Sequence, residues 1–127
     1  MNRAVICLGS NIAPQENIQK AKDSLGRQFR IVSESQFKST RPIGNTRQPD
    51  FINGSVLIET ASEIGELKAA LKRIESALGR DGTVDSSEPR TIDLDIVVWN
   101  NEVVDKDFYR REYLKHSVLE LLPNLKY

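Results

Sequence analysis

The hydrophobic pattern of this 127-residue chain changes period repeatedly, between two, as in strands, and 3.6, as in helices. In chain order it predicts a strand at residues 3–8, a helix at 14–29, strands at 31–37 and 50–60, a helix at 62–78, and a strand at 91–99. Strand, helix, strand, strand, helix, strand is the order of the split βαβ, ferredoxin-like α+β arrangement. We therefore expect an antiparallel sheet with helices on one face, and an open second face that can hold a ligand.

Several boundaries carry their own signals. Pro14 suits the first position of a helix, and Gly79 is expected to end the helix at 62–78. Asn100 and Asn101 can turn the last strand back through residues 102–104. The tail at 112–122 is predicted to be helical. Residues 38–49 are predicted to form a long loop that is either mobile or functional, and residues 81–89 a polar, flexible segment.

Length and charge limit the possible partners. A chain of 127 residues accommodates one domain, and its 18 basic and 18 acidic side chains leave no net field for nucleic acid or an anionic membrane. No apolar run is long enough for a membrane span or a signal-peptide core, so we expect a cytoplasmic protein, either a monomer or a homodimer. The one cysteine, Cys7, lies in an apolar run and is interpreted as a buried, reduced thiol.

The segment 90–98 contains the most informative polar residues. Side chains two apart share a face of a strand, so Asp93 and Asp95 are predicted to lie together. The opposite, core-facing set is expected to be Ile92, Leu94, Ile96 and Val98. With Cα atoms about 6.6 Å apart, the two carboxylates can converge on one or two hard cations, and magnesium carrying a nucleotide fits such a pair. Alternatively, both carboxylates simply face water.

Further residues can complete a nucleotide and heterocycle site. Arg80 and Arg90 flank a predicted loop beside the aspartates and can neutralise phosphate charge, although each alone could be a solvated surface residue. Asn53 can pair its amide with a heterocycle, and Phe51 can offer a ring for stacking. An ordinary edge contact and a core phenylalanine are the alternative interpretation of these two residues.

The combination of motifs resembles the hydroxymethyl-dihydropterin pyrophosphokinase family over residues 1–104. The matching segments are Leu-Gly-Ser-Asn at 8–11, Ser-Thr-Arg-Pro-Ile-Gly at 39–44, Gln-Pro-Asp-Phe-Ile-Asn at 48–53, Ile-Glu at 74–75, Gly-Arg at 79–80 and Pro-Arg-Thr-Ile-Asp-Leu-Asp-Ile at 89–96. The resemblance implies the transfer of pyrophosphate from ATP to the hydroxymethyl group of a reduced pterin, within folate biosynthesis.

The resemblance also implies roles for individual residues. Asp93 and Asp95 would hold two magnesium ions, and together with Arg80 and Arg90 they would form the catalytic set. Contacts to ATP would come from Lys72, Arg80, Arg90, Ile96, Arg110, Arg111 and His116. The pterin would be bound by Thr40, Ile43, Phe51 and Asn53, with the loops at 38–49 and 81–89 closing over the substrates.

The chain departs from the family pattern at three places. Gly82 and Ser87 stand where the family usually has an arginine and an aromatic residue, and Lys72 replaces a frequent glutamine. After Val104 the tail is much shorter, so the arginine and the pterin-stacking phenylalanine that follow a Pro-His pair are not recognisable. These losses keep open an alternative, namely a weak or inactive relative that binds a pterin or nucleotide in a regulatory role.

Overall fold

The computed structural model describes residues 1–42, 44, 47–79 and 91–127. Its elements are β1 (Asn2–Ser10), α1 (Pro14–Gln28), β2 (Arg30–Glu34), β3 (Lys38–Thr40), β4 (Phe51–Thr60), α2 (Ile64–Ala77), β5 (Asp93–Trp99), β6 (Glu102–Val103), α3 (Asp107–Arg110) and α4 (Glu112–Leu121).

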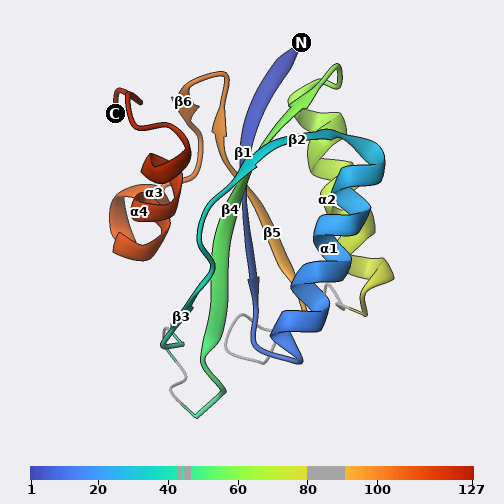
Figure 1. Cartoon of the computed structure of the whole chain (residues 1–127), viewed down its shortest axis with the longest axis vertical. Coiled ribbons are helices and arrows are strands. Elements are labelled where there is room, and N and C mark those ends of the chain that lie inside the picture. Colours follow the sequence, from blue (N-terminus) through green and yellow to red (C-terminus); the bar gives the residue numbers. More distant parts are fainter. Residues whose placement is uncertain (43, 45–46, 80–90) are drawn as a thin grey trace.

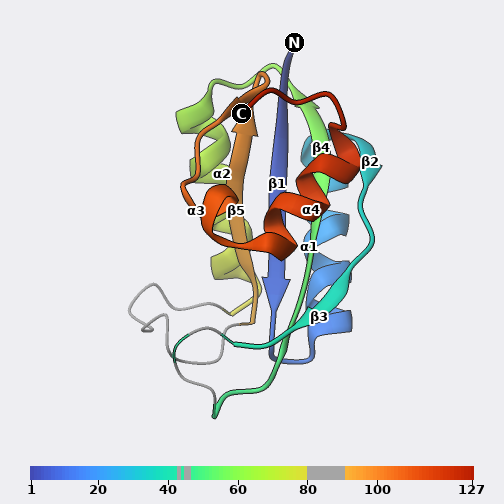
Figure 2. The ribbon, with the colours of Figure 1, turned by 90° about the vertical axis from the view of Figure 1, so that its left-hand side faces the viewer.

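One antiparallel sheet organises the fold. Its strand order is β2-β4-β1-β5-β6, and β3 pairs with β4 beyond the end of β2. Helices α1 and α2 lie on one face of the sheet, and α3 and α4 lie on the other (Figure 1). The α+β, ferredoxin-like arrangement is therefore confirmed, but the second face is not open along its whole length, because α4 crosses over it (Figure 2).

Alternate residues of the same strands feed two hydrophobic clusters. On the α1 and α2 side, Ile6 and Ile58 pack with Leu25 and Leu67, and all four are fully buried. On the α4 side the cluster is Val5, Leu57, Val97, Val98, Phe108, Leu114 and Val118. The C-terminal segment is thus part of the core, since burial of these apolar side chains holds α4 against the sheet.

A β-bulge in β5 changes one predicted face. Val5 pairs with Val98, whereas the next residue, Ile6, pairs with Ile96, so Val97 is the extra residue. The prediction that Val98 shares a face with Leu94 is therefore wrong, because Val98 packs in the α4-side cluster. Asp93 and Asp95 precede the bulge, and their predicted common face is retained.

The local signals at element ends are largely confirmed. Pro14 begins α1, and Gly79, with φ +93°, follows α2. Asn100 and Asn101 both have positive φ (48° and 68°) and reverse the chain from β5 into β6. In contrast, residues 38–40 form β3 rather than a loop. Within the described residues, no helix has the length and apolar character that crossing a membrane requires.

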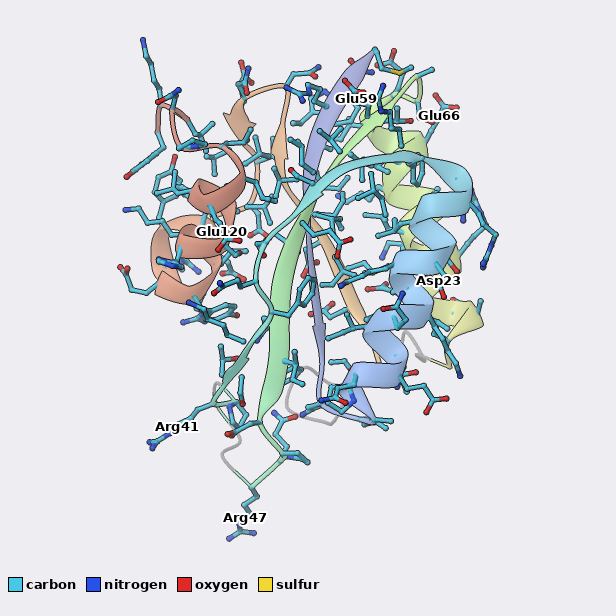
Figure 3. The ribbon with its side chains drawn as sticks, in the orientation of Figure 1. Asp23, Arg41, Arg47, Glu59, Glu66 and Glu120 are labelled. Atoms are coloured by element: carbon cyan, nitrogen blue, oxygen red, sulfur yellow. The ribbon has the colours of Figure 1, made fainter. Side chains whose placement is uncertain are left out.

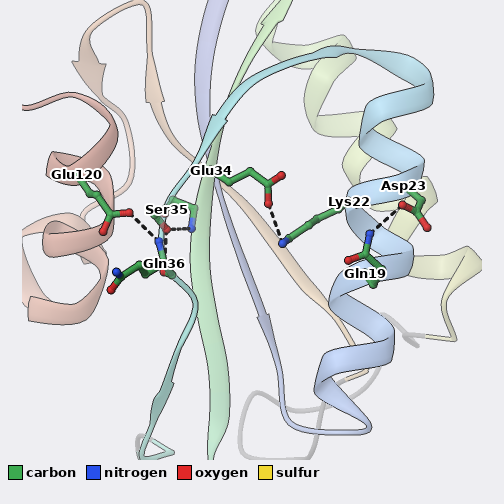
Figure 4. Close-up of polar contacts among 8 residues, drawn as sticks. Gln19, Lys22, Asp23, Glu34, Ser35, Gln36 and Glu120 are labelled. Atoms are coloured by element: carbon green, nitrogen blue, oxygen red, sulfur yellow. Dashed lines mark hydrogen bonds and ion pairs between the residues drawn. The ribbon is translucent and has the colours of Figure 1, made fainter.

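Polar contacts tie the outer elements to the sheet (Figure 4). The Lys22 ammonium lies 2.7 Å from a Glu34 carboxylate oxygen, linking α1 to β2. On the other face, the main-chain N–H of Gln36 donates to Glu120 Oε2 over 2.7 Å, linking the β2–β3 connection to α4. The second contact helps to set the distance between α4 and the sheet.

Candidate active site

A cavity of about 300 Å³ lies beside α4 on the second face of the sheet. Its walls come from β1, β3, β4, β5 and the segment at 105–114, which are far apart in the sequence. The lining residues are Cys7, Gly9, Thr40, Arg41, Phe51, Asn53, Asp93, Asp95, Asp105, Asp107, Arg111, Tyr113 and Leu114. Figure 3 shows Arg41, which follows β3, at the same end of the molecule as Arg47. We call this hollow the sheet cavity.

The floor of the sheet cavity is built from strand pairing. Gly9 of β1 pairs with Asn53 of β4 on one side and with Asp93 of β5 on the other. Two residues earlier, Cys7 pairs in the same way with Asp95. Because residues two apart share a face, the asparagine, the glycine and both aspartates line the same surface. The predicted convergence of Asp93 and Asp95 is therefore found.

Three of the four residues expected to bind a pterin meet in the sheet cavity. Phe51 is buried, Thr40 and Asn53 are half-buried, and the Asn53 Nδ2 donates a hydrogen bond to Thr40 Oγ1. The fourth, Ile43, lies outside the described residues. These three side chains supply an apolar ring and an amide at one end of the cavity.

Tyr113 is the site residue that the sequence analysis missed. It lies in the first turn of α4 and lines the sheet cavity together with Arg111, which immediately precedes that helix. The tail therefore brings an arginine and an aromatic residue to the cavity, although the sequence analysis had assigned Arg111 to ATP and had recognised no counterpart of the family's pterin-stacking phenylalanine. The available signal was the order Arg111, Glu112, Tyr113, because the family resemblance implies an arginine followed by an aromatic residue in this part of the chain.

The phenol of Tyr113 and the thiol of Cys7 are both held in their neutral forms. Desolvation by burial, followed by the influence of Cys7, raises the pKa of Tyr113 to about 12, while Arg111 acts in the opposite direction. Burial, and after it the charges of Asp95 and Asp93, raises the pKa of Cys7 above its ordinary value. A neutral phenol and a neutral thiol suit contact with an uncharged heterocycle and do not suit nucleophilic attack.

A second cavity, of about 730 Å³, lies on the outer side of β5 between α2 and α3. Three residues expected to contact ATP, Lys72, Ile96 and Arg110, line it, and so do Asp93 and Asp95. We call it the edge cavity. The two aspartates therefore line both the sheet cavity and the edge cavity, so a substrate in each cavity would meet the same pair of carboxylates.

Glu75 of α2 supports the backbone between the two aspartates. Its Oε2 accepts a hydrogen bond of 2.8 Å from the main-chain N–H of Leu94. Strand β6 pairs with Val98 and Trp99, so among the described residues no strand lies beside the Asp93–Asp95 end of β5 on its outer side. The carboxylate takes the place of a strand partner and fixes the edge on which the aspartates stand.

The structure does not bring the other residues expected to contact ATP, Arg111 and His116, into the edge cavity. Arg111 lines the sheet cavity rather than the edge cavity, and exposed His116 lines a third hollow of about 300 Å³ with Lys38 and Glu120. Neither is brought to Lys72. Arg80, Arg90 and the whole of the second predicted loop at 81–89, which includes the altered positions 82 and 87, lie outside the described residues.

Asp105 and Asp107 are two further residues that line both cavities and that the sequence analysis did not predict. The main-chain N–H of Asp107 donates to Asp105 Oδ1 over 2.9 Å, so the Asp105 carboxylate turns the chain into α3. In the described part of the chain, no group of three or more His, Cys, Asp or Glu side chains could hold a metal ion. The candidate metal ligands therefore remain the pair Asp93 and Asp95.

An antiparallel sheet with a carboxylate pair between two cavities fits an α+β enzyme that brings a nucleotide to a second small substrate. Comparison with known proteins identifies the family. A family model described as 7,8-dihydro-6-hydroxymethylpterin-pyrophosphokinase (HPPK) matches residues 5–123. This chain belongs to that family.

Individual relatives agree with this assignment. The chain is 32% identical to the 2-amino-4-hydroxy-6-hydroxymethyldihydropteridine pyrophosphokinase of Haemophilus influenzae, with 98% of this chain and 84% of the relative covered. It is 31% identical to the protein of the same name from Pseudomonas aeruginosa, with coverages of 99% and 84%. The Bacillus subtilis protein of that name is 36% identical over 84% of this chain and 65% of its own length.

Proposed function

We propose that this chain transfers the pyrophosphoryl group of ATP to the hydroxymethyl group of 6-hydroxymethyl-7,8-dihydropterin, giving AMP and the pterin diphosphate. This pyrophosphokinase reaction is the folate-biosynthesis activity of the family to which the chain belongs. The observation that carries the proposal for this particular site is that Asp93 and Asp95 line both the sheet cavity and the edge cavity. The two substrates would meet at these carboxylates.

The sheet cavity is the proposed pterin site. Phe51 and Tyr113, which line it from the sheet and from α4, would offer ring faces to the flat heterocycle. Asn53 would pair its amide with the donors and acceptors on the edge of the pterin. Thr40 and Ile43 complete this proposed set by resemblance to the family.

The edge cavity is the proposed ATP site. Lys72, Ile96 and Arg110 line it, and two of these three side chains carry positive charge that suits a polyphosphate. Arg80 and Arg90 are proposed to contact the phosphates by resemblance to the family. For Arg111 we propose a contact with the transferring group from the pterin side, in place of the ATP role expected from the sequence. For His116 the ATP role remains a prediction that its position in the third hollow does not favour.

Magnesium is the proposed metal cofactor, as two ions held by Asp93 and Asp95. The donor set fits, because magnesium prefers oxygen ligands, takes only one or two carboxylates from the protein and obtains the rest from phosphates and water. When bound, magnesium would neutralise charge on the phosphates and polarise the phosphorus–oxygen bonds.

In the proposed reaction the pterin hydroxyl oxygen forms a bond to the β-phosphorus of ATP. The bond from that phosphorus to the oxygen bridging to the α-phosphorus breaks, the electron pair of that bond stays with the departing AMP, and the proton of the hydroxyl is released to water. The chain contributes by orienting both substrates: Asn53 and the aromatic rings hold the acceptor, and the cationic side chains hold the donor. Glu75 keeps the strand edge in place through its contact with the Leu94 N–H.

We also propose that residues 1–127 form one catalytic domain that acts in the cytoplasm on small molecules and not on nucleic acid. The single sheet joining the first and last described strands supports one domain, and the balanced charge supports small-molecule partners.

A direct assay tests the activity. The purified protein is incubated with ATP, magnesium and 6-hydroxymethyl-7,8-dihydropterin, and AMP formation is followed. We expect AMP that depends on the pterin, and a loss of at least about a hundredfold in kcat for Asp95→Asn, because that change removes a charged ligand from the proposed magnesium ions. Asp23→Asn is the matched control, since Asp23 lies on α1 away from both cavities.

The same assay addresses the regulatory alternative. No observation in the structure favours it. Absence of AMP while magnesium-ATP still binds would contradict the enzyme assignment and support a binding protein, whereas equal rates for Asp95→Asn and Asp23→Asn would contradict the role of the carboxylate pair.

A further inference from the structure

Gly9 occupies the centre of the sheet-cavity floor. In β1 it pairs with Asn53 on one side and Asp93 on the other, so it separates the proposed pterin ligand from the proposed metal ligand by one strand. Gly9 itself lines the cavity. A residue in this place can influence the substrate directly or through its two neighbours.

The space above Gly9 is already taken by the Asn53 side chain. A Cβ atom added at Gly9 would lie 2.5 Å from Asn53 Oδ1 and 3.6 Å from its Cγ. The first distance is far shorter than carbon and oxygen atoms tolerate, so one of the two residues would have to move. The constraint here is one of space and not of backbone conformation, because Gly9 lies within an extended strand.

The other end of the same amide is held from β3. Asn53 Nδ2 donates to Thr40 Oγ1, and the residue pairing Lys38 with Asn53 and Thr40 with Phe51 keeps β3 alongside β4. The amide is thus confined between a bare glycine and a threonine hydroxyl. Its oxygen and its second N–H proton have one defined orientation with respect to the cavity.

We propose that Gly9 is a positioning residue for the heterocyclic substrate, acting by leaving room for the Asn53 amide to lie against β1 in the orientation that Thr40 holds. This inference rests on the proposed pterin-binding function of the sheet cavity. A side chain at position 9 pushes the amide off β1 and breaks its bond to Thr40. The donor and acceptor offered to the pterin are then misplaced, while the edge cavity is unchanged.

The test compares Gly9→Ala with the wild-type protein in two titrations. We expect KM for the pterin, and its Kd measured by calorimetry with a non-hydrolysable ATP analogue present, to rise about tenfold, the usual effect of misplacing one or two hydrogen bonds. KM for ATP should change less than about twofold. Gly26→Ala is the matched control, because a Cβ there lies 3.7 Å from its nearest neighbour, Ile31, in ordinary contact.

A double-mutant cycle separates positioning from general damage. In an Asn53→Ala background, Gly9→Ala should have little further effect on pterin affinity, because the side chain that it displaces is gone. Thr40→Val should imitate Gly9→Ala, and Thr40→Ser, which keeps the hydroxyl, should restore affinity. If Gly9→Ala fails to fold, the Gly9→Ala, Asn53→Ala double variant should recover folding, because the clash is removed.

Two outcomes would overturn the inference alone: an unchanged pterin KM and Kd in Gly9→Ala, or effects of the two substitutions that simply add. A wild-type protein that binds magnesium-ATP but no pterin would instead overturn the proposed function, and the inference with it.

Discussion

Tyr113 gives the proposed pterin site its second aromatic side chain and gives the protein a response to alkaline pH. Its phenol lines the sheet cavity, where burial raises its pKa to about 12 from an ordinary value near 10. Since the folded-state pKa is the higher one, the unfolded state loses its proton first as the pH rises. The contribution of the Tyr113 phenol to the free energy of unfolding is therefore fully present below about pH 10 and is lost between about pH 10 and 12.

We predict that Tyr113→Phe reduces this alkaline loss of stability. Urea unfolding at pH 8 and pH 11 should show a smaller fall in the free energy of unfolding for the variant than for the wild type. Part of the fall should remain, because the pKa of Cys7 is also raised in the folded protein.

Tyr109→Phe is the control for this experiment, because the Tyr109 side chain is 60% exposed in the folded protein. Equal losses in Tyr113→Phe and Tyr109→Phe would show that the Tyr113 phenol is not held in a desolvated position.

At the scale of elements, α4 completes the sheet cavity and is held by both polar and apolar contacts. Ser117 Oγ lies 2.7 Å from Ser55 Oγ of β4, and Val118 is fully buried in the α4-side cluster. Ser117 follows Tyr113 by one helical turn, so a helix held at Ser117 also holds the tyrosine over the cavity. Docking of α4 is therefore expected to contribute to both stability and pterin binding.

We predict that Val118→Ala lowers the free energy of unfolding by about 2 kcal/mol, through lost burial and the cavity left behind. Because α4 carries Tyr113, KM for the pterin should also rise, while KM for ATP should stay close to the wild-type value. Urea unfolding and steady-state kinetics provide the two measurements.

Val32→Ala is the matched control for Val118→Ala, since Val32 is 39% exposed on β2 and should change stability by less than about 0.5 kcal/mol. A Val118→Ala protein of wild-type stability would show that α4 is not docked on the sheet as described.

For the whole molecule, the proposed ATP site joins α2, β5 and α3, so its ligand should stabilise the folded state as a unit. We predict that magnesium-ATP at about a hundred times its Kd raises the free energy of unfolding by about 2.7 kcal/mol. Removal of magnesium with EDTA should abolish most of this gain, because the Asp93 and Asp95 carboxylates would then face phosphate oxygens without a cation between them.

Thermal unfolding with and without EDTA measures the effect, and Asp95→Asn beside Asp23→Asn supplies the control pair. A gain in Tm with ATP that is unaffected by EDTA and by Asp95→Asn would contradict a metal-dependent nucleotide site at these carboxylates.

The sequence by itself determined features that depend on neighbouring residues. Alternation before the bulge placed Asp93 and Asp95 on one face, and helical spacing predicted α1 and α2, because both periodicities are set by local backbone geometry. Asn100 and Asn101 predicted their turn because few other residues adopt positive φ readily.

Only the tertiary structure decided what depends on packing between distant segments. The bulge at Val97, the short β3 and the crowding of Gly9 by Asn53 arise between strands that are far apart in the sequence, and Tyr113 reaches the site only because α4 packs on the sheet. A pattern of hydrophobicity states which face of an element is buried but not which element covers it. For that reason the carboxylate pair and the sheet residues Thr40, Phe51 and Asn53 could be named from the sequence, whereas the wall that α4 and Tyr113 add to the cavity could not.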